Sequence, residues 1–486
     1  MNATSVLRLW LARCMGLMVC LGCLRGAILQ AGPGAESADA AVVQVSSDQA
    51  RDAANLAVDA DDRPDPNSGL LLSPTAIDSG SIYDRSLWER GYLTGNWLGF
   101  RERWAERGVT FDLSSTQFYQ GVTTGGLDRI FEYSGRNDYL FHFDAERSGL
   151  WSGLYIDLHG ETRYGTDINN NAGPILSPPN IAMLFPLPEG NHTALTSVKL
   201  TQYLSESLVV FGGKFNMLDE LIQTFGGGRG VDAFMNTGLV FPVVLDRTVP
   251  YSTLGAGGAI MQGKRALFTL MAFDTHNTPT TTGFESFFTN GVTVLSKLEI
   301  PVSLGGLPGH QGVEGTYSTG TYASLRTIPY IDVNGLPSAT FVPVQGSWSV
   351  FYMADQALYV DPNNPERSWG VFTNIGWADN DPSPIRFSAS VGVGGSSPLV
   401  SRPLDTFGIG YSHVAPSQGM QQLDPVLVPL RSDNAVELYY NMAVAPWLRV
   451  TPDLQILVPD RIQTLPPNVQ PVETTILFGV RAKMVF

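Results

Sequence analysis

The chain ends in a segment in which apolar and polar side chains alternate. In residues 473–486 (ETTILFGVRAKMVF), the even positions from Ile476 to Phe486 are apolar, whereas Arg481 and Lys483 stand at odd positions. A period of two residues is that of a β-strand with two different faces. The pattern fits a soluble sandwich, whose apolar face meets a core, and it equally fits a transmembrane barrel, whose charged side lines a wet lumen.

The same alternation recurs along most of the chain after residue 109. Residues 139–146 place Tyr139 and Phe141 on one face, and His142 and Asp144 on the other. Counting such segments predicts about sixteen strands, an even number of the kind that bacterial outer-membrane barrels have. The clearest of these segments are 111–120, 139–146, 154–163, 198–204, 208–216, 385–391, 436–442 and 448–456.

Each alternating segment also predicts which side chains face the inside. In residues 208–216, Lys214 and Asn216 are expected in the lumen, opposite Val209, Phe211 and Phe215. If the sheet is a membrane barrel, lipid covers the apolar face of nearly every strand and water fills the interior.

The connections between these segments alternate in length. Short connections are expected at 146–153, 205–206, 262–265 and 445–446, and long ones at 165–193, 217–254 and 416–433. Short turns at one rim and long loops at the other are typical of outer-membrane barrels. No blade-like repeat indicates a propeller, and no run of about 18 apolar residues predicts a membrane helix. The sequence therefore predicts an all-β fold, a transmembrane antiparallel barrel over residues 109–486.

The N-terminal region has a different composition. Arg8 and Arg13 precede an apolar run at 15–24, and Ala38 and Ala40 offer a small-x-small cleavage site, so residues 1–40 are interpreted as an export signal. Residues 41–86 are rich in Asp, Ala and Pro and are expected to form a disordered leader.

A short amphipathic helical segment is expected over residues 87–108, ahead of the barrel. Trp97, Phe100 and Trp104 recur at three- and four-residue spacing, Asn96 is a candidate N-cap, and Gly108 marks the end. We expect this segment to pack at the periplasmic mouth of the barrel.

Composition excludes several kinds of chemistry. The net charge is −15, which argues against nucleic acid as a partner because phosphate binding requires a basic surface. All three cysteines, Cys14, Cys20 and Cys23, lie in the predicted signal, so the exported chain would have neither a cysteine nucleophile nor a cysteine metal site.

Several motifs resemble those of one known family, the carbohydrate-selective outer-membrane porins of the OprB type. The segment GNWLGFRERWAERGVTFDL is similar to the family's N-terminal signature, with Gly95, Trp97, Gly99 and Arg101 at the motif positions. VVFGGKFNMLDE resembles a Gly-Lys-x-Asn strand end in the same family, and later strands and the terminal Phe486 are similar as well. The resemblance covers roughly residues 87–486.

The resemblance implies a sixteen-stranded pore in the bacterial outer membrane that admits small sugars, with N-terminal helices at the periplasmic mouth. Its implied partners are small carbohydrates, outer-membrane lipid and the barrel assembly machinery, which would recognise the C-terminal strand ending in Phe486. No cofactor, no metal and no enzymatic activity are expected.

A sugar passage needs balanced hydrogen-bonding groups without a deep binding well. Alternation on one predicted strand groups His159, Glu161 and Arg163, and Lys214 is expected from a neighbouring hairpin. These residues are candidates for the constriction, because the adjacent long loop could fold inward. Further candidates are Arg229 and Arg247 in that loop, and Arg386, Glu437, Arg449 and Asp453 across the wall.

Two alternatives remain open at this point. The charges could simply solvate a lumen and pair with one another, without forming a constriction. The barrel could also serve as an adhesin, a structural protein or a membrane enzyme. Carboxylates spaced like Asp144 and Glu146 suggest a glycosidase, but any polar lumen produces the same spacing, and no known hydrolase or nucleotide-binding motif is present.

Overall fold

The structure, a computed structural model, describes residues 86–486 except 189, 222, 264, 327, 332–336, 341, 423–429 and 465–468. The predicted signal (1–40) and all of the predicted leader (41–86) except Ser86 lie outside the described residues. In the part of the chain that is described, no helix has the length and apolar character needed to cross a lipid bilayer.

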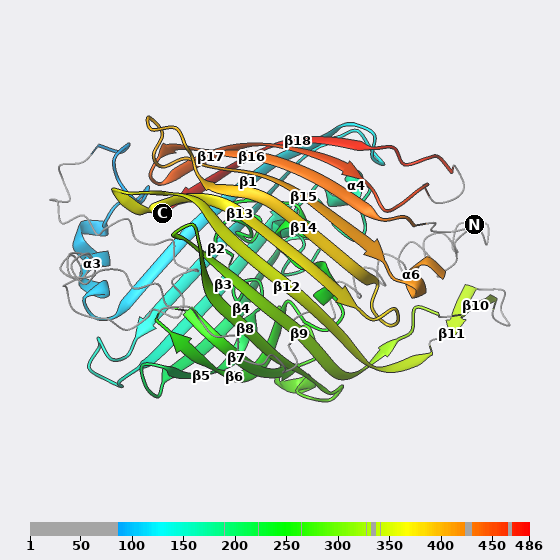
Figure 1. Cartoon of the computed structure of the whole chain (residues 1–486), viewed down its shortest axis with the longest axis horizontal. Coiled ribbons are helices and arrows are strands. Elements are labelled where there is room, and N and C mark those ends of the chain that lie inside the picture. Colours follow the sequence, from blue (N-terminus) through cyan, green and yellow to red (C-terminus); the bar gives the residue numbers. More distant parts are fainter. Residues whose placement is uncertain are drawn as a thin grey trace.

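Sixteen strands form one closed antiparallel barrel, which confirms the predicted fold class and strand number (Figure 1). The first strand, β1, pairs with the last, β18, so the sheet has no free edge. The wall strands are β1 (Val109–Thr124), β2 (Phe131–Asp144), β3 (Leu154–Gly165), β4 (His192–Tyr203), β5 (Leu208–Asn216), β6 (Ser252–Gln262), β7 (Arg265–Asp274), β8 (Val292–Leu304), β9 (Leu307–Ala323), β12 (Pro343–Asp361), β13 (Asn364–Ala378), β14 (Ile385–Ser396), β15 (Thr406–Pro416), β16 (Asp433–Ala445), β17 (Leu448–Val458) and β18 (Thr475–Val485).

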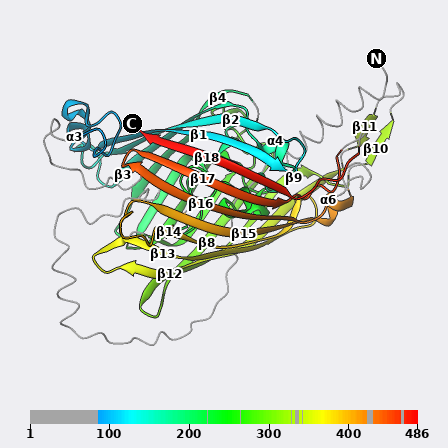
Figure 2. The same ribbon diagram turned by 90° about the horizontal axis from the view of Figure 1, so that it is seen from above.

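Connections of contrasting length separate the two ends of the barrel, as predicted. The short-turn end carries connections such as 204–207, 305–306 and 446–447, together with the C-terminus. The long-loop end carries 166–191, 217–251, 275–291 and 417–432. It also carries β10 (Ile328–Ile331) and β11 (Pro337–Thr340), which pair in a separate hairpin that projects from the wall (Figures 1 and 2).

Short helices lie in the connections and before β1. They are η1 (Trp97–Gly99), α3 (Phe100–Ala105), α4 (Asn169–Ala172), η2 (Ile181–Met183), α5 (Thr237–Val240), η3 (Val243–Leu245), η4 (Phe284–Ser286) and α6 (Gln418–Gln422).

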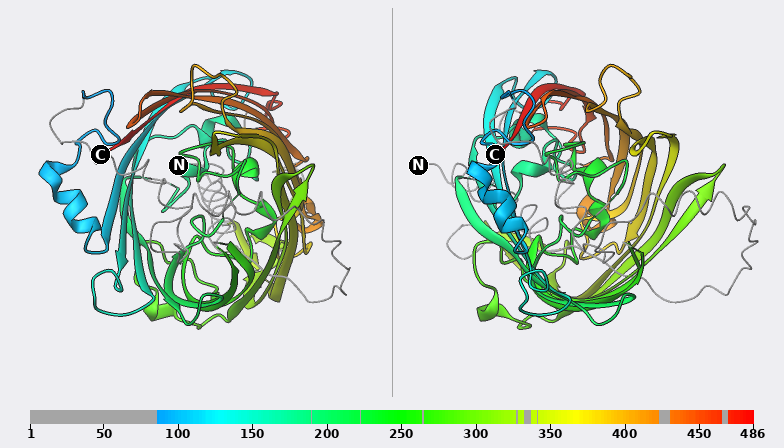
Figure 3. Two further views of the ribbon diagram at one scale, coloured as in Figure 1. Left: turned by 60° about the vertical axis from the view of Figure 1, so that its left-hand side comes forward. Right: turned by 90° about the vertical axis from the view of Figure 1, so that its left-hand side faces the viewer.

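The segment before β1 is helical, but its helices are shorter than the predicted 87–108 segment. They end at Ala105, and turns lead to Gly108, whose φ of 79° favours glycine. The Asn96 side chain accepts a bond of 3.3 Å from the Glu102 N–H. Figure 3 shows α3 beside the barrel wall at the short-turn end, and the Trp97 ring lies 5.0 Å from that of Phe111 on β1.

The two faces of the wall differ in the way that the alternation predicts. On β16, Glu437 is fully buried on the inside, whereas its neighbour Leu438 is 47% exposed on the outside. On β18, Arg481 is buried on the inside and Phe478 is 43% exposed on the outside. The exposed apolar belt matches the hydrocarbon interior of a bilayer. The closed sheet matches it as well, because lipid cannot hydrogen-bond the backbone groups of an open edge.

Two long connections fold into the barrel and fill part of it. Residues 166–191 and 217–251 lie inside the ring of strands (Figure 3). Phe234, Leu239 and Val244 in the second connection are completely buried, against inward side chains such as Phe351 and Phe372. The expectation that water fills the whole interior is therefore wrong, since the two connections supply an apolar core on the inner wall.

This inner core also alters the predicted inner face of β5. Val209 and Phe215, which were expected opposite the lumen, are buried in the interior clusters, whereas Val210 is exposed on the outside. Asn216 does lie inside, as predicted, because its Nδ2 donates to the Tyr251 hydroxyl at 3.0 Å, and Lys214 pairs in register with Leu254. The prediction failed because it assumed a wet inside, whereas here the inside of the wall meets apolar loop residues.

The outer apolar face predicts a marked cost for a charge at mid-strand. Leu438→Arg should lower the free energy of unfolding by about 2–4 kcal/mol, because a cation near the bilayer midplane loses its hydration. The control is Val400→Arg, at a site that is 87% exposed in the 397–405 connection of the short-turn end. Denaturant unfolding in lipid vesicles measures both variants. Equal stability of the two would contradict the assignment of this face to lipid.

Candidate functional site

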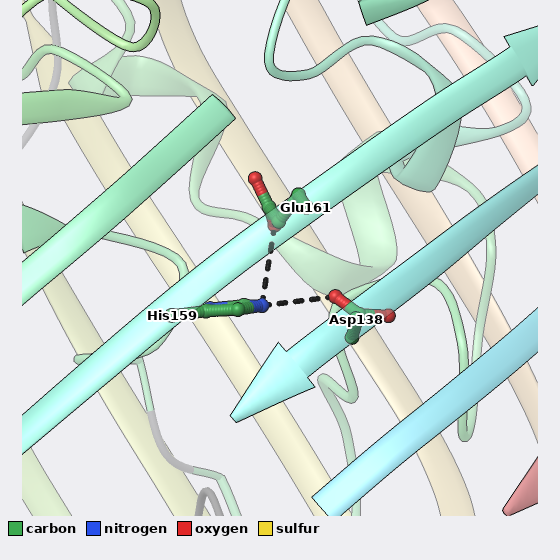
Figure 4. Close-up of side chains that lie close together, drawn as sticks. All are labelled: Asp138, His159 and Glu161. Atoms are coloured by element: carbon green, nitrogen blue, oxygen red, sulfur yellow. Dashed lines mark hydrogen bonds and ion pairs between the residues drawn. The ribbon is translucent and has the colours of Figure 1, made fainter. Parts of the chain in front are cut away.

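A compact group of charged side chains lies on the inner face where β2, β3 and the inward connection 217–251 meet. Asp138 on β2 pairs in register with Glu161 on β3, and Arg136 lies two residues before Asp138, so both point inward. His159 lies two residues before Glu161 for the same reason. Figure 4 shows Asp138, His159 and Glu161 converging from the two strands.

The Arg136 guanidinium joins the carboxylates of the two strands. Its Nε and Nη2 donate to Asp138 Oδ1 at 2.9 and 2.8 Å, and its Nη2 also donates to Glu161 Oε1. His159 Nε2 lies 3.0 Å from Asp138 Oδ1. All four side chains are almost completely buried, so their charges are compensated by one another and hardly at all by solvent.

The inward connection adds a second cation and a third carboxylate. Asp219 Oδ2 lies 2.6 Å from His159 Nδ1, and Arg229 Nη1 donates to Asp219 Oδ1 at 3.1 Å. Arg229 Nη1 is also 3.9 Å from Asp138 Oδ1. Burial alone would raise the pKa of the Asp219 carboxyl, but His159 and Arg229 lower it below its usual range. We call Arg136, Asp138, His159, Glu161, Asp219 and Arg229 the charged cluster.

Aromatic and amide groups extend from the charged cluster toward the other inward connection, 166–191. The Tyr251 hydroxyl donates to Glu161 Oε2, and Asn216 Nδ2 donates to the same hydroxyl at 3.0 Å. The ring of Phe185, in the connection 166–191, stacks on Tyr251 with centroids 4.0 Å apart. Two stacked aromatic rings therefore lie directly beside the buried polar groups of the charged cluster.

The charged cluster contains one set of groups with the spacing of metal ligands. One ligand atom each from Asp138, His159 and Glu161 lies within 4.8 Å of the others. However, Arg136 already donates to Asp138 Oδ1 and Glu161 Oε1, the same two oxygens that a metal would use. A guanidinium therefore supplies the positive charge at this place, and the residues fit an ion-pair network better than a metal site.

Strands β16 and β18 hold the inward connection 217–251 by its main chain. Glu437 Oε1 and Oε2 accept from the N–H groups of Met235 and Asn236 at 2.6 and 2.8 Å. Arg481 Nη1 donates to the carbonyl oxygens of Gly230 and Ala233 at 3.0 and 2.8 Å. These wall charges anchor the connection 217–251 and so determine how far it reaches across the lumen.

The structure brings together three of the predicted constriction residues. His159, Glu161 and Arg229 belong to the charged cluster, as the preceding distances show. Arg163 lies on the same face of β3, but it contacts Asp167 and the Leu187 carbonyl, so it holds the connection 166–191.

The other predicted residues lie away from the charged cluster. Lys214 Nζ donates to the carbonyl oxygen of Leu195 on β4 at 2.8 Å, and to those of Pro279 and Thr281 in the connection 275–291 at 3.2 and 2.8 Å. Arg247 Nε donates to the Pro382 carbonyl at 2.8 Å.

Candidates from the later strands also occupy separate positions. Arg386 is exposed at the start of β14, beside a register shift at the long-loop end. Arg449 pairs in register with Lys483 near the short-turn end, and its charge acts on Asp232. Asp453 accepts a bond of 3.2 Å from Gln455 next to the anchor residue Glu437.

Sequence reasoning missed Arg136, Asp138, Asp219 and Tyr251. The first two were within reach, because Ser134, Arg136 and Asp138 extend the polar face of residues 139–146 backwards along β2. Asp219 and Tyr251 lie in a connection that has no strand period, so no signal in the sequence marks them.

A second polar group on β7–β9 and β12 was also missed. Glu299 Oε1 pairs with Arg265 Nη1 at 3.0 Å, and Glu299 Oε2 pairs with Lys297 Nζ at 2.8 Å. His310 Nδ1 lies 3.2 Å from Asp355 Oδ1 on the adjacent strand. All of these strands contribute to the inner wall, so charged pairs line more than one side of the interior.

Solved structures share this architecture. The high-pH structure of Pseudomonas putida OprB is similar over 83% of this chain and all of that chain, with a TM-score of 0.68 and 20% sequence identity. The low-pH structure of the same protein covers 82% of this chain and 99% of its own, with a TM-score of 0.50 and 17% identity. At these identities the likeness shows the fold alone.

Sequence comparisons agree with the fold. Porin B of Pseudomonas aeruginosa is 25% identical over 210 residues, which span 38% of this chain and 45% of Porin B. The model of the carbohydrate-selective porin family OprB matches residues 128–486, well over half of the chain. A porin barrel resides in the bacterial outer membrane, and this chain belongs to the OprB family of carbohydrate-selective porins.

Proposed function

We propose that the protein is a passive diffusion channel for small neutral carbohydrates, with the charged cluster at its constriction. The observation that carries this proposal is the composition of the charged cluster, in which two guanidinium groups and His159 face three carboxylates in the interior of the barrel. A neutral solute with many hydroxyl groups can exchange hydrogen bonds with both signs of charge there. An ion of either sign meets a repulsive charge next to each attractive one.

The aromatic pair beside the charged cluster supports the same ligand class. Phe185 is partly exposed and stacks on the buried Tyr251 ring, and the Tyr251 hydroxyl donates to Glu161. A sugar has an apolar C–H face and a polar rim, so it matches an aromatic ring that lies beside charged groups. The description of the matching family, carbohydrate-selective porin, names the same class of solute.

The transport that we propose involves no catalytic step. Glu161 and Asp138 both accept hydrogen bonds from Arg136 within a buried ion-pair network, whereas the two carboxyl groups of a glycosidase flank the bond that is cleaved. We also propose that the barrel assembly machinery recognises the C-terminal strand with Phe486, a strand that closes the barrel against β1.

Liposome swelling tests the proposed permeability directly. Vesicles that contain the purified protein should swell in isotonic solutions of pentoses and hexoses, and much more slowly in a trisaccharide or in a charged solute of hexose size. Protein-free vesicles are the control. Absence of swelling with every sugar would instead indicate a sealed barrel with a structural or adhesive role.

Ion selectivity tests whether the charged cluster lies on the permeation path. Glu161→Gln removes a negative charge and Arg229→Gln a positive one, so their cation-to-anion permeability ratios should move in opposite directions, by roughly twofold each in moderate salt. Arg386→Gln, at the exposed rim, is the matched control and should change the ratio less. Reversal potentials in planar bilayers give these ratios. A shift of the same sign in both variants would remove the charged cluster from the path.

The anchor at Glu437 should control the size limit of the channel. Glu437→Ala leaves the Met235 and Asn236 N–H groups without their partner, at a cost of about 1–3 kcal/mol for each buried group. The connection 217–251 should then move more freely, raise the single-channel conductance and admit larger sugars. Glu473→Ala, in the connection 459–474, serves as the control. Unchanged conductance in a correctly folded Glu437→Ala barrel would contradict the anchoring role.

A further inference from the structure

The pairing between β1 and β18 is the seam of the barrel. Ser114 pairs with Val485 near the short-turn end, and the register continues to Thr124 and Ile476. The other wall pairs are joined by a connection between consecutive barrel strands, whereas this pair joins the two ends of the sheet. The entropic cost of bringing β1 and β18 together is therefore the largest of any pair in the barrel, because all the strands between them lie in the loop that is closed.

The segment before β1 makes a contact across this seam. Arg101 Nη2 donates to the backbone oxygen of Phe486, the residue that follows β18, and Nη1 donates to the Phe111 carbonyl of β1 at 3.0 Å. The guanidinium carbon lies 4.0, 4.9 and 4.6 Å from the ring centroids of Tyr92, Trp97 and Phe111. This aromatic surrounding partly shields the guanidinium from solvent and attracts its positive charge.

The Tyr92 phenol completes the aromatic surrounding in its neutral form. Burial and the nearby Asp112 carboxylate raise the pKa of Tyr92 to about 12. The phenol therefore keeps its proton at neutral pH and donates to Asp112 Oδ1 at 3.3 Å.

The same segment binds the far side of the seam at two further points. The Leu93 N–H donates to the Val485 carbonyl of β18 at 2.8 Å. The Trp447 indole, in the turn between β16 and β17, donates to the Leu87 carbonyl at 2.8 Å, and its ring stacks on Trp88 with centroids 6.4 Å apart. Figures 1 and 2 show α3 beside the C-terminus at the short-turn end, where β1 and β18 run side by side.

We propose that residues 87–105 are a seam strap, which locks β1 to β18 in the closed barrel. The strap is continuous with β1 but binds residues of β18 and of the β16–β17 turn, so its full set of contacts exists only in the closed barrel. A segment that binds only the closed state stabilises that state. Arg101 is the positioning residue of the strap, because its guanidinium donates to main-chain oxygens on both sides of the seam.

Unfolding kinetics test the seam strap. Arg101→Ala should accelerate unfolding of the detergent-solubilised barrel by about 10- to 100-fold, because it removes a charge-assisted contact that bridges the seam. Arg103→Ala is the matched control, since among the described residues the Arg103 guanidinium bonds only within the strap, to Gly99 O at 3.1 Å and Leu98 O at 3.5 Å. The conductance of the folded barrel should be unchanged in both variants. Unfolding is followed by the mobility difference between folded and unfolded protein in unheated gels.

A second variant tests the strap at another contact, with Arg101 in place. Trp447→Phe removes the indole N–H that donates to the Leu87 carbonyl, so it should also accelerate unfolding. Wild-type unfolding rates in both Arg101→Ala and Trp447→Phe, or an equal acceleration in Arg103→Ala, would overturn the proposal.

Discussion

Closure of the sheet is the constraint on which the rest of this structure depends. A strand edge inside a bilayer would leave a row of N–H and C=O groups without partners, and each unpaired group costs several kcal/mol there. The pairing of β1 with β18 removes that edge. Once the ring is closed, every strand has one face toward lipid and one toward the interior, which accounts for the contrast between Glu437 and Leu438 on neighbouring positions.

The interior then follows from how charges behave away from bulk water. Isolated charges are costly at this depth, so the inward charges described above are paired or bind main-chain groups. On β2 and β3 the pairing produces the charged cluster around Arg136. On β16 and β18, Glu437 and Arg481 instead bind the main chain of an inward connection. One type of residue pattern on the wall therefore performs two tasks: it pairs charges at the proposed constriction, and it holds the inward connection.

The sequence alone predicted the barrel well and the site in part, and the difference has a physical cause. The alternation of apolar and polar side chains is a local property, so the sequence shows where strands lie. It also predicts that His159 and Glu161 share one inward face. It assumes that the inside is wet, which fails at Val209 and Phe215, where loop residues from far along the chain form an apolar core. Contacts such as Asp219 with His159 depend on the path of an irregular connection, and no period in the sequence records that path.

The inward connection 217–251 also has a mechanical consequence. It is rooted between β5 and β6, and its far side is bound to β18 and to β16, which lie five and seven strands from β5 in the ring of sixteen. A segment fixed on both sides acts as a brace between the walls that it joins. Moving these walls together or apart would strain the bonds of Glu437 and Arg481 to the connection, so the brace opposes such a deformation of the ring.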